Sequence, residues 1–392
     1  MPLGRLVLLT GINGKGKSTA LQALLLIHQS VNRAHALQQT LRRIELNGHY
    51  VRLGNFREVQ HRDRRVGVEP ITISFEFADD ATNATVTSLV LEQRDGNERW
   101  AGIARIEVER FDGNKCVFQD SREPDDTDDY VILPFDGASA DKLGRFSRLG
   151  DLTHVHYVSA DRLGPRDFFP RTSDNDFVSV GVRGEMTAEV LYRMHKDRVT
   201  LADNDVRTRE GASTMTILDQ TSAWLSYVFD GGAVQVTSLQ ETVLTLEMNA
   251  DNSVHYYRAI NLGFGYSYAL PILVAGLMAM PGEFLIIENP EAHLHPLAQS
   301  RIGEFLATVS AVGVQVLVES HSEHVLNAFR LAVRGRQLTP QDIRVLYFRR
   351  DEDEPIIHIP VQEDGGIASW PDGFFDQRMR DFEKLFGEGQ DG

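Results

Sequence analysis

The sequence predicts an α/β fold in which a mainly parallel sheet is combined with a β-rich arm and a helical insertion. Three observations support this prediction. A short apolar strand at 6–9 runs into a glycine-rich loop and then into an amphipathic helix. The apolar run 284–288 has the continuous hydrophobicity of a strand that is covered on both faces. Between these two strands, 71–118 contains runs that alternate apolar and polar residues, as half-buried strands do.

The composition is that of an ordinary globular protein, with 392 residues, 42% hydrophobic residues and 24% charged residues. The net charge of −16 argues against a broadly basic nucleic-acid surface, although it does not exclude a local one. A single cysteine allows no internal disulfide and suits a reducing cytoplasm. Met1 leads directly into the first strand and the longest apolar run, 269–280, is short, so we expect a cytoplasmic protein without signal peptide or membrane span.

The glycine-rich loop 11–19 matches the phosphate-binding pattern G-x-x-x-x-G-K-[ST] at Gly11, Gly16, Lys17 and Ser18. In such a loop the backbone N–H groups surround a phosphate chain, and the N-terminus of the following helix adds partial positive charge. Lys17 is expected to reach the β- and γ-phosphates, and the Ser18 hydroxyl to bind Mg²⁺. The agreement of strand, loop and helix argues against an ordinary glycine-rich turn. The residues expected to contact the nucleotide are Asn13, Gly14, Gly16, Lys17, Ser18 and Thr19.

Two carboxylates follow the apolar strand 284–288. Glu288 ends the strand and is expected to hold Mg²⁺ directly or through water. Glu291 lies three residues further on, where it can orient an attacking water as a catalytic base. The alternating His293 and His295 suggest zinc as an alternative, but further clustered ligands are missing from the sequence, so a turn that opens a helix at 297–310 is the simpler interpretation.

Two more segments add anion-binding features. His321 follows an apolar strand at 314–318, and a histidine at such a strand end can hydrogen-bond a γ-phosphate. Ser320 beside it is not surrounded by a nucleophile-elbow pattern, so we do not interpret it as a hydrolase nucleophile. Gly265 and Ser267 precede a predicted helix at about 268–280, an arrangement that also favours anions.

The rest of the chain suggests three segments, with boundaries at 1–140, 141–235 and 236–392. The first contains the phosphate loop and the β-rich arm, the second is a helical insertion, and the third completes the nucleotide lobe. Further helices are expected at 34–43, 185–197 and 213–229, and strands at 155–159, 234–248 and 255–260.

Three charged segments remain, and two of them leave alternatives open. The basic segment 57–65 is either a solvated loop or a binding patch, and the acidic segment 120–129 is expected to be an exposed loop. Arg162 and Arg166 follow a strand; they meet phosphate or a partner carboxylate, or they are structural arginines.

These motifs, in this order, resemble the ABC-type ATPases, and more closely their OLD-like (overcoming lysogenization defect) branch, relatives of RecF- and SMC-type ATPases. Residues 11–19 look like Walker A, and 262–271 look like the signature G-F-G-x-S-Q-x-L-P. Residues 285–296 look like Walker B with the D-loop, and 319–326 look like the switch-histidine segment. The tail 370–376 looks like the W-P-x-G-F-F-D signature of a subgroup without an assigned function.

The resemblance implies an α/β P-loop NTPase lobe of ABC type that binds ATP and Mg²⁺. It assigns phosphate binding to Lys17 and Mg²⁺ binding to Ser18 and Glu288. It also makes Glu291 the catalytic base and His321 the γ-phosphate sensor.

The resemblance further implies an ATP-dependent homodimer, in which Gly265 and Ser267 contact the nucleotide bound by the other subunit. Gln60 is expected as the metal-binding Q-loop residue, with Asn55 as an alternative. Tyr268 departs from the branch, because it stands where a glutamine is usual, and the strands that usually precede Walker A are largely missing. OLD proteins carry a Toprim nuclease domain after the switch histidine. We expect no such domain in the residues that follow His321, because the D-x-D at 351–353 is better explained as a hairpin tip.

The role implied is that of a sensor or regulator ATPase in bacterial antiphage defence or genome maintenance, acting with a separate effector protein encoded nearby. The main alternative is a DNA-binding RecF- or SMC-like repair ATPase, which salt-dependent DNA binding would reveal. A self-contained nuclease and a nucleotide kinase are further alternatives, and the kinase would leave the signature and switch-histidine segments without a purpose.

Overall fold

The computed structural model describes residues 3–36, 43–60, 62–63, 67–68, 70–78, 84–93, 100–110, 115–119, 152, 154–171, 179–250, 254–351 and 354–386. The chain forms two compact units, Met1–Lys17 with His156–Gly392, and Ser18–Val155. The three predicted segments stay a prediction. The acidic loop at 120–129 and two residues of the D-x-D motif, 352–353, lie outside the described residues.

A six-stranded sheet organises the first unit, with the order β17-β16-β1-β15-β14-β9. Four of these strands run parallel, and β17 joins the edge in antiparallel sense. Because β15 lies between β1 and β14, the switch-histidine segment begins between the two nucleotide-binding strands. The strands are β1 (Leu6–Gly11), β9 (Val155–Val158), β14 (Phe284–Glu288), β15 (Gln315–Glu319), β16 (Ile343–Phe348) and β17 (Ile356–Ile359).

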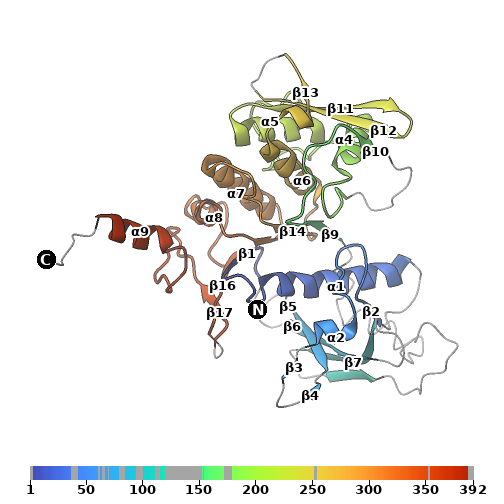
Figure 1. Cartoon of the computed structure of the whole chain (residues 1–392), viewed down its shortest axis with the longest axis vertical. Coiled ribbons are helices and arrows are strands. Elements are labelled where there is room, and N and C mark those ends of the chain that lie inside the picture. The colour runs from blue at the N-terminus through green and yellow to red at the C-terminus, as the bar shows by residue number, and fades with distance from the viewer. Residues whose placement is uncertain are drawn as a thin grey trace. The chain divides into compact units, whose positions relative to one another are not determined.

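The helices of the first unit between 187 and 334 gather on one side of this sheet, and the helix Gln377–Phe386 extends away from it, as Figure 1 shows. Their caps explain where two of them begin: His295 precedes a proline at the first turn of α7, and the Ser322 side chain accepts from two backbone N–H groups of α8. The helices are α4 (Thr187–Lys196), α5 (Ile217–Phe229), α6 (Phe264–Met278), α7 (Pro296–Ala311), α8 (Glu323–Arg334) and α9 (Gln377–Phe386).

A small antiparallel sheet completes the first unit, formed by β10 (Phe169–Pro170), β11 (Ala233–Gln240), β12 (Val243–Asn249) and β13 (Tyr257–Arg258). The predicted strand 234–248 is therefore a hairpin, with β11 and β12 paired to each other. The predicted return strand 255–260 is also shorter, since β13 gives way to a 3-10 turn at Ala259–Asn261.

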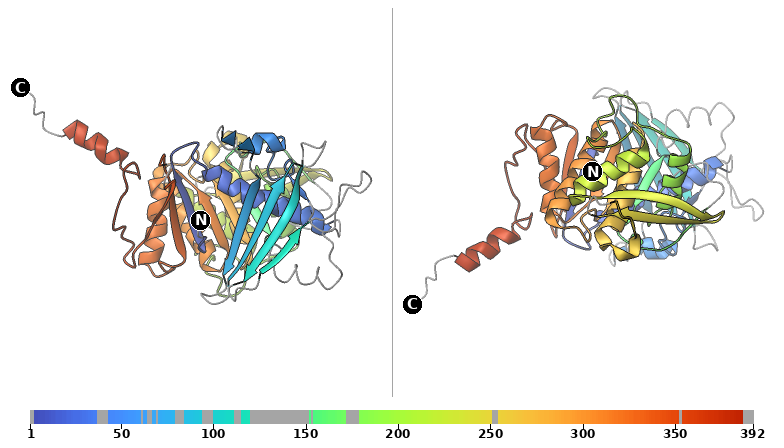
Figure 2. Two further views of the ribbon diagram at one scale, coloured as in Figure 1. Left: turned by 90° about the horizontal axis from the view of Figure 1, so that it is seen from below. Right: turned by 90° about the horizontal axis from the view of Figure 1, so that it is seen from above.

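The second unit contains a long helix and an antiparallel sheet of order β2-β7-β6-β5, in which β8 pairs with β7. Figure 2 shows these strands beside helix α1. Of the predicted helix at 34–43, residues 34–36 form the end of α1 and Arg43 begins a strand, while 37–42 lie outside the described residues. The elements are α1 (Lys17–Ala36), β2 (Arg43–Glu45), α2 (Phe56–Val59), β3 (Arg62–Asp63), β4 (Gly67–Val68), β5 (Ile71–Ala78), β6 (Ala84–Glu92), β7 (Trp100–Arg110) and β8 (Lys115–Gln119).

Both units have apolar interiors of the expected kind. In the first unit the strands β1, β14 and β15 are buried along nearly their whole length. In the second unit Leu89, Ile103 and Ile106 of the sheet are buried, and so is Leu21 of α1. Across the described part of the chain, no helix combines the length and hydrophobicity that a membrane span requires.

Candidate nucleotide-binding site

The phosphate loop leaves β1 at Gly11 and turns through glycines with left-handed backbone. Gly14 has φ +72° and Gly16 has φ +99°, values that residues with a side chain rarely adopt. Lys17 turns back over the loop, where its Nζ donates to the carbonyl oxygens of Gly11 (3.1 Å) and Ile12 (3.0 Å). The ammonium group therefore lies inside the loop, where the sequence predicts that it meets phosphate.

Glu288 is held at the end of β14 by the neighbouring strand β9. Its Oε1 accepts a hydrogen bond from the Tyr157 hydroxyl (3.0 Å), and its Oε2 accepts from the Ala160 backbone N–H (3.1 Å). Burial, followed by the charge of Glu288, raises the pKa of Tyr157 far above its usual value, so this hydroxyl remains a donor. These two hydrogen bonds from the protein orient the carboxylate.

Glu291 connects the turn after β14 to the turn after β15. Its Oε2 accepts from the Ser320 hydroxyl (2.8 Å), and its Oε1 accepts from the backbone N–H of His321 (2.7 Å). The structure therefore brings together the proposed base and the proposed γ-phosphate sensor, which the sequence had placed thirty residues apart.

The charges at this edge influence one another. Residues Leu9, Glu319 and Glu288 lie side by side at the ends of β1, β15 and β14. Burial lowers the pKa of Lys17, while the carboxylate of Glu319 acts in the opposite direction. Burial and the charge of Lys17 lower the pKa of His321, and Glu291 opposes this shift. His321 is therefore favoured as a neutral imidazole at neutral pH, able to accept or donate a hydrogen bond.

The segment at the start of α6 differs from the prediction in two respects. The helix begins at Phe264, four residues earlier than expected, because Gly263 has the extended backbone of an N-cap. Ser267 consequently lies inside the first turn, and its Oγ is buried without a hydrogen-bond partner among the described residues.

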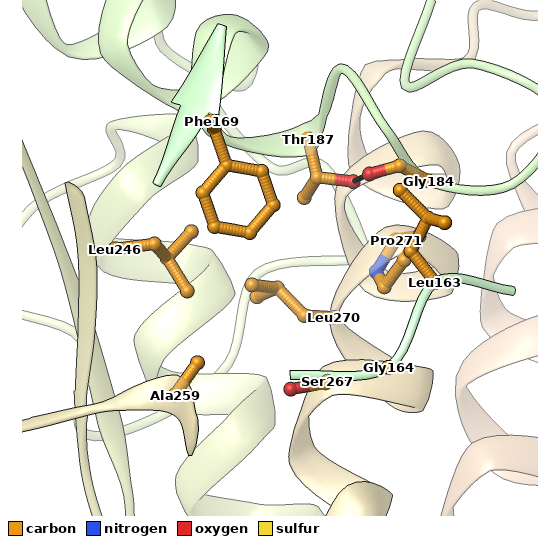
Figure 3. Close-up of a pocket in the computed structure, with 10 residues that line it drawn as sticks. All are labelled: Leu163, Gly164, Phe169, Gly184, Thr187, Leu246, Ala259, Ser267, Leu270 and Pro271. Carbon is orange, nitrogen blue, oxygen red and sulfur yellow. Dashed lines mark hydrogen bonds between the residues drawn. The ribbon is translucent and has the colours of Figure 1, made fainter. Parts of the chain in front are cut away.

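The Ser267 hydroxyl faces a cavity of about 20 Å³ within the first unit, shown in Figure 3. In the single chain this hydroxyl is enclosed, and Gly265 is also buried. The predicted contact of these two residues with a nucleotide of another subunit stays a prediction. The cavity is lined by Leu163, Gly164, Phe169, Gly184, Thr187, Leu246, Ala259, Ser267, Leu270 and Pro271.

Other predicted site residues lie in the second unit, whose placement relative to the first is not described. The unit boundary falls within the phosphate loop, so Ser18 and Thr19 are described with α1 of the second unit. Gln60 is the C-cap of α2. Asn55 is the N-cap of the same helix and accepts from the Glu58 N–H at 3.1 Å, which gives its side chain a structural role. Asn13 is an exposed loop residue of the first unit.

The two histidines of the zinc alternative make other contacts. His295 caps α7, and His293 packs against the ring of Tyr268 with centroids 4.5 Å apart. No group of three or more His, Cys, Asp or Glu side chains suited to a metal ion occurs among the residues that the structure describes.

The tail 370–376 folds beside the phosphate loop. Phe374 is buried and packs edge-on against Tyr347 of β16, with ring centroids 5.3 Å apart. Together with Gly11, Ile12 and His321, residues of the tail line a cavity of about 230 Å³. The tail is thus a wall of the nucleotide-binding edge, which the sequence pattern alone did not place there.

The sequence analysis did not assign an orienting role to Tyr157, Ala160 or Ser320. It named Arg162 with three alternatives: contact with phosphate, contact with a partner carboxylate, or a structural role. The hydrogen bonds of Arg162 go to main-chain oxygens, which fits the structural role. The order of strands in the sheet, which places β9 beside β14, would have been needed to identify these contacts.

A protein-family model described as "AAA domain, putative AbiEii toxin, Type IV TA system" matches residues 6–327. The chain belongs to this AAA-domain family. A second model, described as a protein of unknown function, matches residues 338–385 of the AAA-domain protein, which include the tail 370–376. The predicted α/β fold of P-loop type is confirmed by this match and by the sheet described above.

Solved SMC head structures are similar to this AAA-domain protein at low identity. An SMC head bound to the C-winged helix domain of ScpA is 10% identical, with a TM-score of 0.43 and 93% of each chain covered. An SMC head from Pyrococcus furiosus, with an extended coiled coil and bound to the C-terminal domain of ScpA, is 11% identical, with a TM-score of 0.42, covering 98% of this chain and 94% of that chain. The SMC head domain of Thermotoga maritima is 11% identical, with a TM-score of 0.35 and 92% of each chain covered. No curated protein matches the sequence.

The residues of this AAA-domain protein fit a nucleotide with its magnesium ion. The loop offers left-handed glycines and an enclosed ammonium group, which together suit a polyphosphate. Glu288 offers an oriented carboxylate of the oxygen-ligand type that Mg²⁺ prefers. The family therefore implies nucleotide binding, and the geometry of Lys17 and Glu288 agrees with it.

Proposed function

We propose that this protein hydrolyses ATP in the presence of Mg²⁺. The observation that carries the proposal is the Glu291 carboxylate, which lies at the same sheet edge as the phosphate loop and is joined to the switch-histidine segment by two hydrogen bonds. Such an arrangement suits the positioning of water beside a terminal phosphate better than simple nucleotide storage, because a carboxylate adds nothing to the binding of an anion.

Each side chain has a separate task in this proposal. Bound Mg²⁺–ATP supplies the phosphoanhydride and a divalent charge that neutralises its oxygens. Lys17 neutralises the β- and γ-phosphate oxygens, and Ser18 and Glu288 hold the metal, with Gln60 as the further metal ligand. Glu291 accepts a proton from the attacking water, and neutral His321 donates a hydrogen bond to the γ-phosphate.

We further propose that the protein works as an ATP-dependent homodimer, in which both subunits contribute to each nucleotide site. Support comes from exposed apolar side chains in the stretch leading into α6: Tyr257 is 43% exposed, Ile260 48% and Phe264 54%. Large exposed apolar side chains that gather in one short stretch of the chain support an interaction surface there. Because Gly263 at the helix start is exposed, its backbone can approach a phosphate held by a second copy, whereas the buried Ser267 hydroxyl is not used.

A mixing experiment tests the shared site. Lys17→Ala removes the phosphate-binding ammonium, and Gly263→Arg places bulk at the helix start, where an added Cβ meets no atom within 4 Å. Each variant alone should be inactive. In an equal mixture half of the dimers are mixed and each has one intact site, so about a quarter of wild-type ATPase activity should return.

The matched control is Leu331→Arg, which adds the same charge at an exposed position of α8. It should be active alone. A mixture of Lys17→Ala and Gly263→Arg that stays inactive although subunits exchange would contradict the shared site, as would wild-type ATPase activity from a strict monomer.

The finer role that we propose is regulation of a separate effector in antiphage defence or genome maintenance. The family description, which names a toxin–antitoxin system, supports a protein that acts with a partner. The pure protein should therefore leave plasmid DNA intact with Mg²⁺ or Mn²⁺. Cleavage that is lost in Asp351→Ala would contradict this, and salt-dependent duplex binding would favour the alternative of a DNA-binding repair ATPase.

A further inference from the structure

Arg162 is an arginine whose charge is buried without a carboxylate in direct contact among the described residues. The residue is 2% exposed, and burial lowers the pKa of its guanidinium to about 10. Its hydrogen bonds go to main-chain oxygens: Nη1 donates to Ser159 (3.2 Å) and Glu288 (2.7 Å), and Nη2 donates to Asn289 (2.5 Å). Burying a cation costs free energy, so this set of bonds calls for a specific role.

Two of the three carbonyl oxygens that Arg162 holds, those of Glu288 and Asn289, belong to the turn that presents Glu291. Asn289 has φ +45° and His293 has φ +61°, left-handed values that cost free energy for residues with a side chain. The guanidinium is planar, so it fixes the two successive peptide groups of Glu288 and Asn289 at defined angles. A turn with this strain keeps its shape when neighbouring groups hold it.

The same guanidinium reaches helix α6. Its Cζ lies 5.1 Å from the centroid of the Tyr268 ring, within the range of a cation–π contact. The Tyr268 ring also packs against His293, at the end of the same turn, with ring centroids 4.5 Å apart. Arg162, Tyr268 and His293 therefore form a continuous contact from the start of the turn, across α6, to its end.

We propose that Arg162 and Tyr268 are positioning residues that hold the turn 288–293 in the shape that places Glu291, and that make this shape depend on the first turns of α6. A displacement of α6, for instance by a partner surface, would then reach Glu291 without a contact between that partner and the carboxylate. The effect on catalysis rests on the proposed ATP hydrolysis, whereas the effect on the turn does not.

Amide hydrogen exchange on the nucleotide-free full chain tests the turn directly. The amides of Asn289, Ala292 and Leu294 donate to Glu319, Asn289 and Glu291 carbonyl oxygens, respectively, and report its order. Arg162→Lys keeps the charge but loses the planar set of donors, so exchange of the peptide covering 288–294 should accelerate about tenfold. Arg183→Lys is the matched control, since the exposed Arg183 donates to Asp161 of the same loop.

Tyr268 variants separate the ring from the hydroxyl. Tyr268→Phe keeps the ring face and should stay within about twofold of wild type in exchange and in kcat. Tyr268→Leu removes the cation–π contact and should accelerate local exchange and lower kcat by about three- to thirtyfold, whereas the Kd for a non-hydrolysable ATP analogue changes less than about twofold.

These readouts distinguish the possible failures. The proposal would be overturned if amide exchange at 288–294 were unchanged in both Arg162→Lys and Tyr268→Leu. It would also be overturned if exchange accelerated equally in β1 and β15, because this indicates a general loss of stability. If Arg162→Lys does not fold, the pair of Tyr268 variants decides alone. If the wild type does not hydrolyse ATP, the proposed function fails, while exchange still decides whether the two residues position the turn.

Discussion

Replacement of Glu291 by glutamine isolates proton transfer from every other task of the site. The carboxylate accepts two hydrogen bonds, from the Ser320 hydroxyl at 2.8 Å and from the His321 N–H at 2.7 Å. A glutamine keeps both contacts, because its Oε1 accepts from the His321 N–H and its Nε2 donates to the Ser320 oxygen. We therefore expect the free energy of unfolding to change by less than about 1 kcal/mol.

The catalytic effect should be much larger. An amide cannot accept a proton from water, and general base catalysis contributes roughly 10²- to 10⁴-fold. The expected fall in kcat corresponds to about 3 to 5 kcal/mol of activation free energy. Steady-state phosphate release gives kcat, and titration with a fluorescent ATP analogue shows whether binding is retained.

Ser320→Ala is the matched control for Glu291→Gln. It removes one of the two hydrogen bonds and leaves the base, so the turn loosens while turnover survives in part. A wild-type kcat for Glu291→Gln would refute the assignment of Glu291 as the base. Loss of ATP binding in Glu291→Gln would instead make Glu291 a binding residue.

Three other variants test separate parts of the structure. Lys17→Ala should weaken ATP binding by about ten- to a hundredfold without unfolding the protein, as titration with the same analogue would show, because a charge-assisted contact is lost. Gly373→Ala should lower the free energy of unfolding by about 1 to 3 kcal/mol, since φ is +80° and the added Cβ lies 2.7 Å from the hydroxyl of the β16 tyrosine. Gly282→Ala, with φ +88° and open space, should cost less in the same chemical denaturation, and an equal cost would contradict the steric argument. Asp205→Asn breaks a buried ion pair with Arg207. Burial by itself raises the pKa of Asp205, but the hydrogen bonds from Arg207 outweigh this effect, so the net pKa lies below the usual range. The stabilisation is present above the unfolded pKa near 4 and is lost as pH falls through the lower folded pKa, so the variant should lose about 3 to 5 kcal/mol at pH 7 but less in acid. If the difference in the free energy of unfolding between Asp205→Asn and wild type did not change with pH, this explanation would be refuted.

The sequence predicted the strands that carry the site more accurately than it predicted their surroundings. The strand 284–288 agrees with β14 residue for residue, because its four apolar residues and terminal glutamate lie between Gly282-Glu283 and Asn289-Pro290. The hairpin of β11 and β12 was not resolved, since its turn lacks Gly, Pro and Asn, the usual signals. Residues 34–36, which the sequence suggested as the start of a second helix, instead continue α1.

The site shows the same division between local and non-local information. Lys17 and Glu288 belong to motifs in which a few adjacent residues determine the conformation, so a single sequence was enough to locate them. Tyr157 reaches Glu288 because β9 lies beside β14 in the sheet. Arg162 reaches the carbonyl oxygen of Asn289 through its buried side chain. Neither of these two contacts has a local sequence pattern, and both depend on the order of the strands in the folded sheet.

Ser267 gives the clearest opposition between the family pattern and the structure. If its hydroxyl contacted a nucleotide, Ser267→Ala would lower kcat or binding substantially. In the structure the hydroxyl is buried, lacks a hydrogen-bond partner among the described residues and faces a cavity of about 20 Å³. A buried hydroxyl without a partner costs free energy, so its removal should leave the free energy of unfolding unchanged or raise it by up to about 1 kcal/mol.

The ATPase rate of Ser267→Ala should stay within about twofold of wild type. Ser267→Val places two methyl groups in a space that holds about one water molecule and should destabilise the protein by about 1 to 3 kcal/mol. Comparison of both variants by chemical denaturation and phosphate release therefore separates packing from phosphate contact. If Ser267→Ala lost most of its activity at full stability, α6 would have to turn in the active state so that the hydroxyl leaves its cavity, and the proposed backbone contact at Gly263 would be wrong.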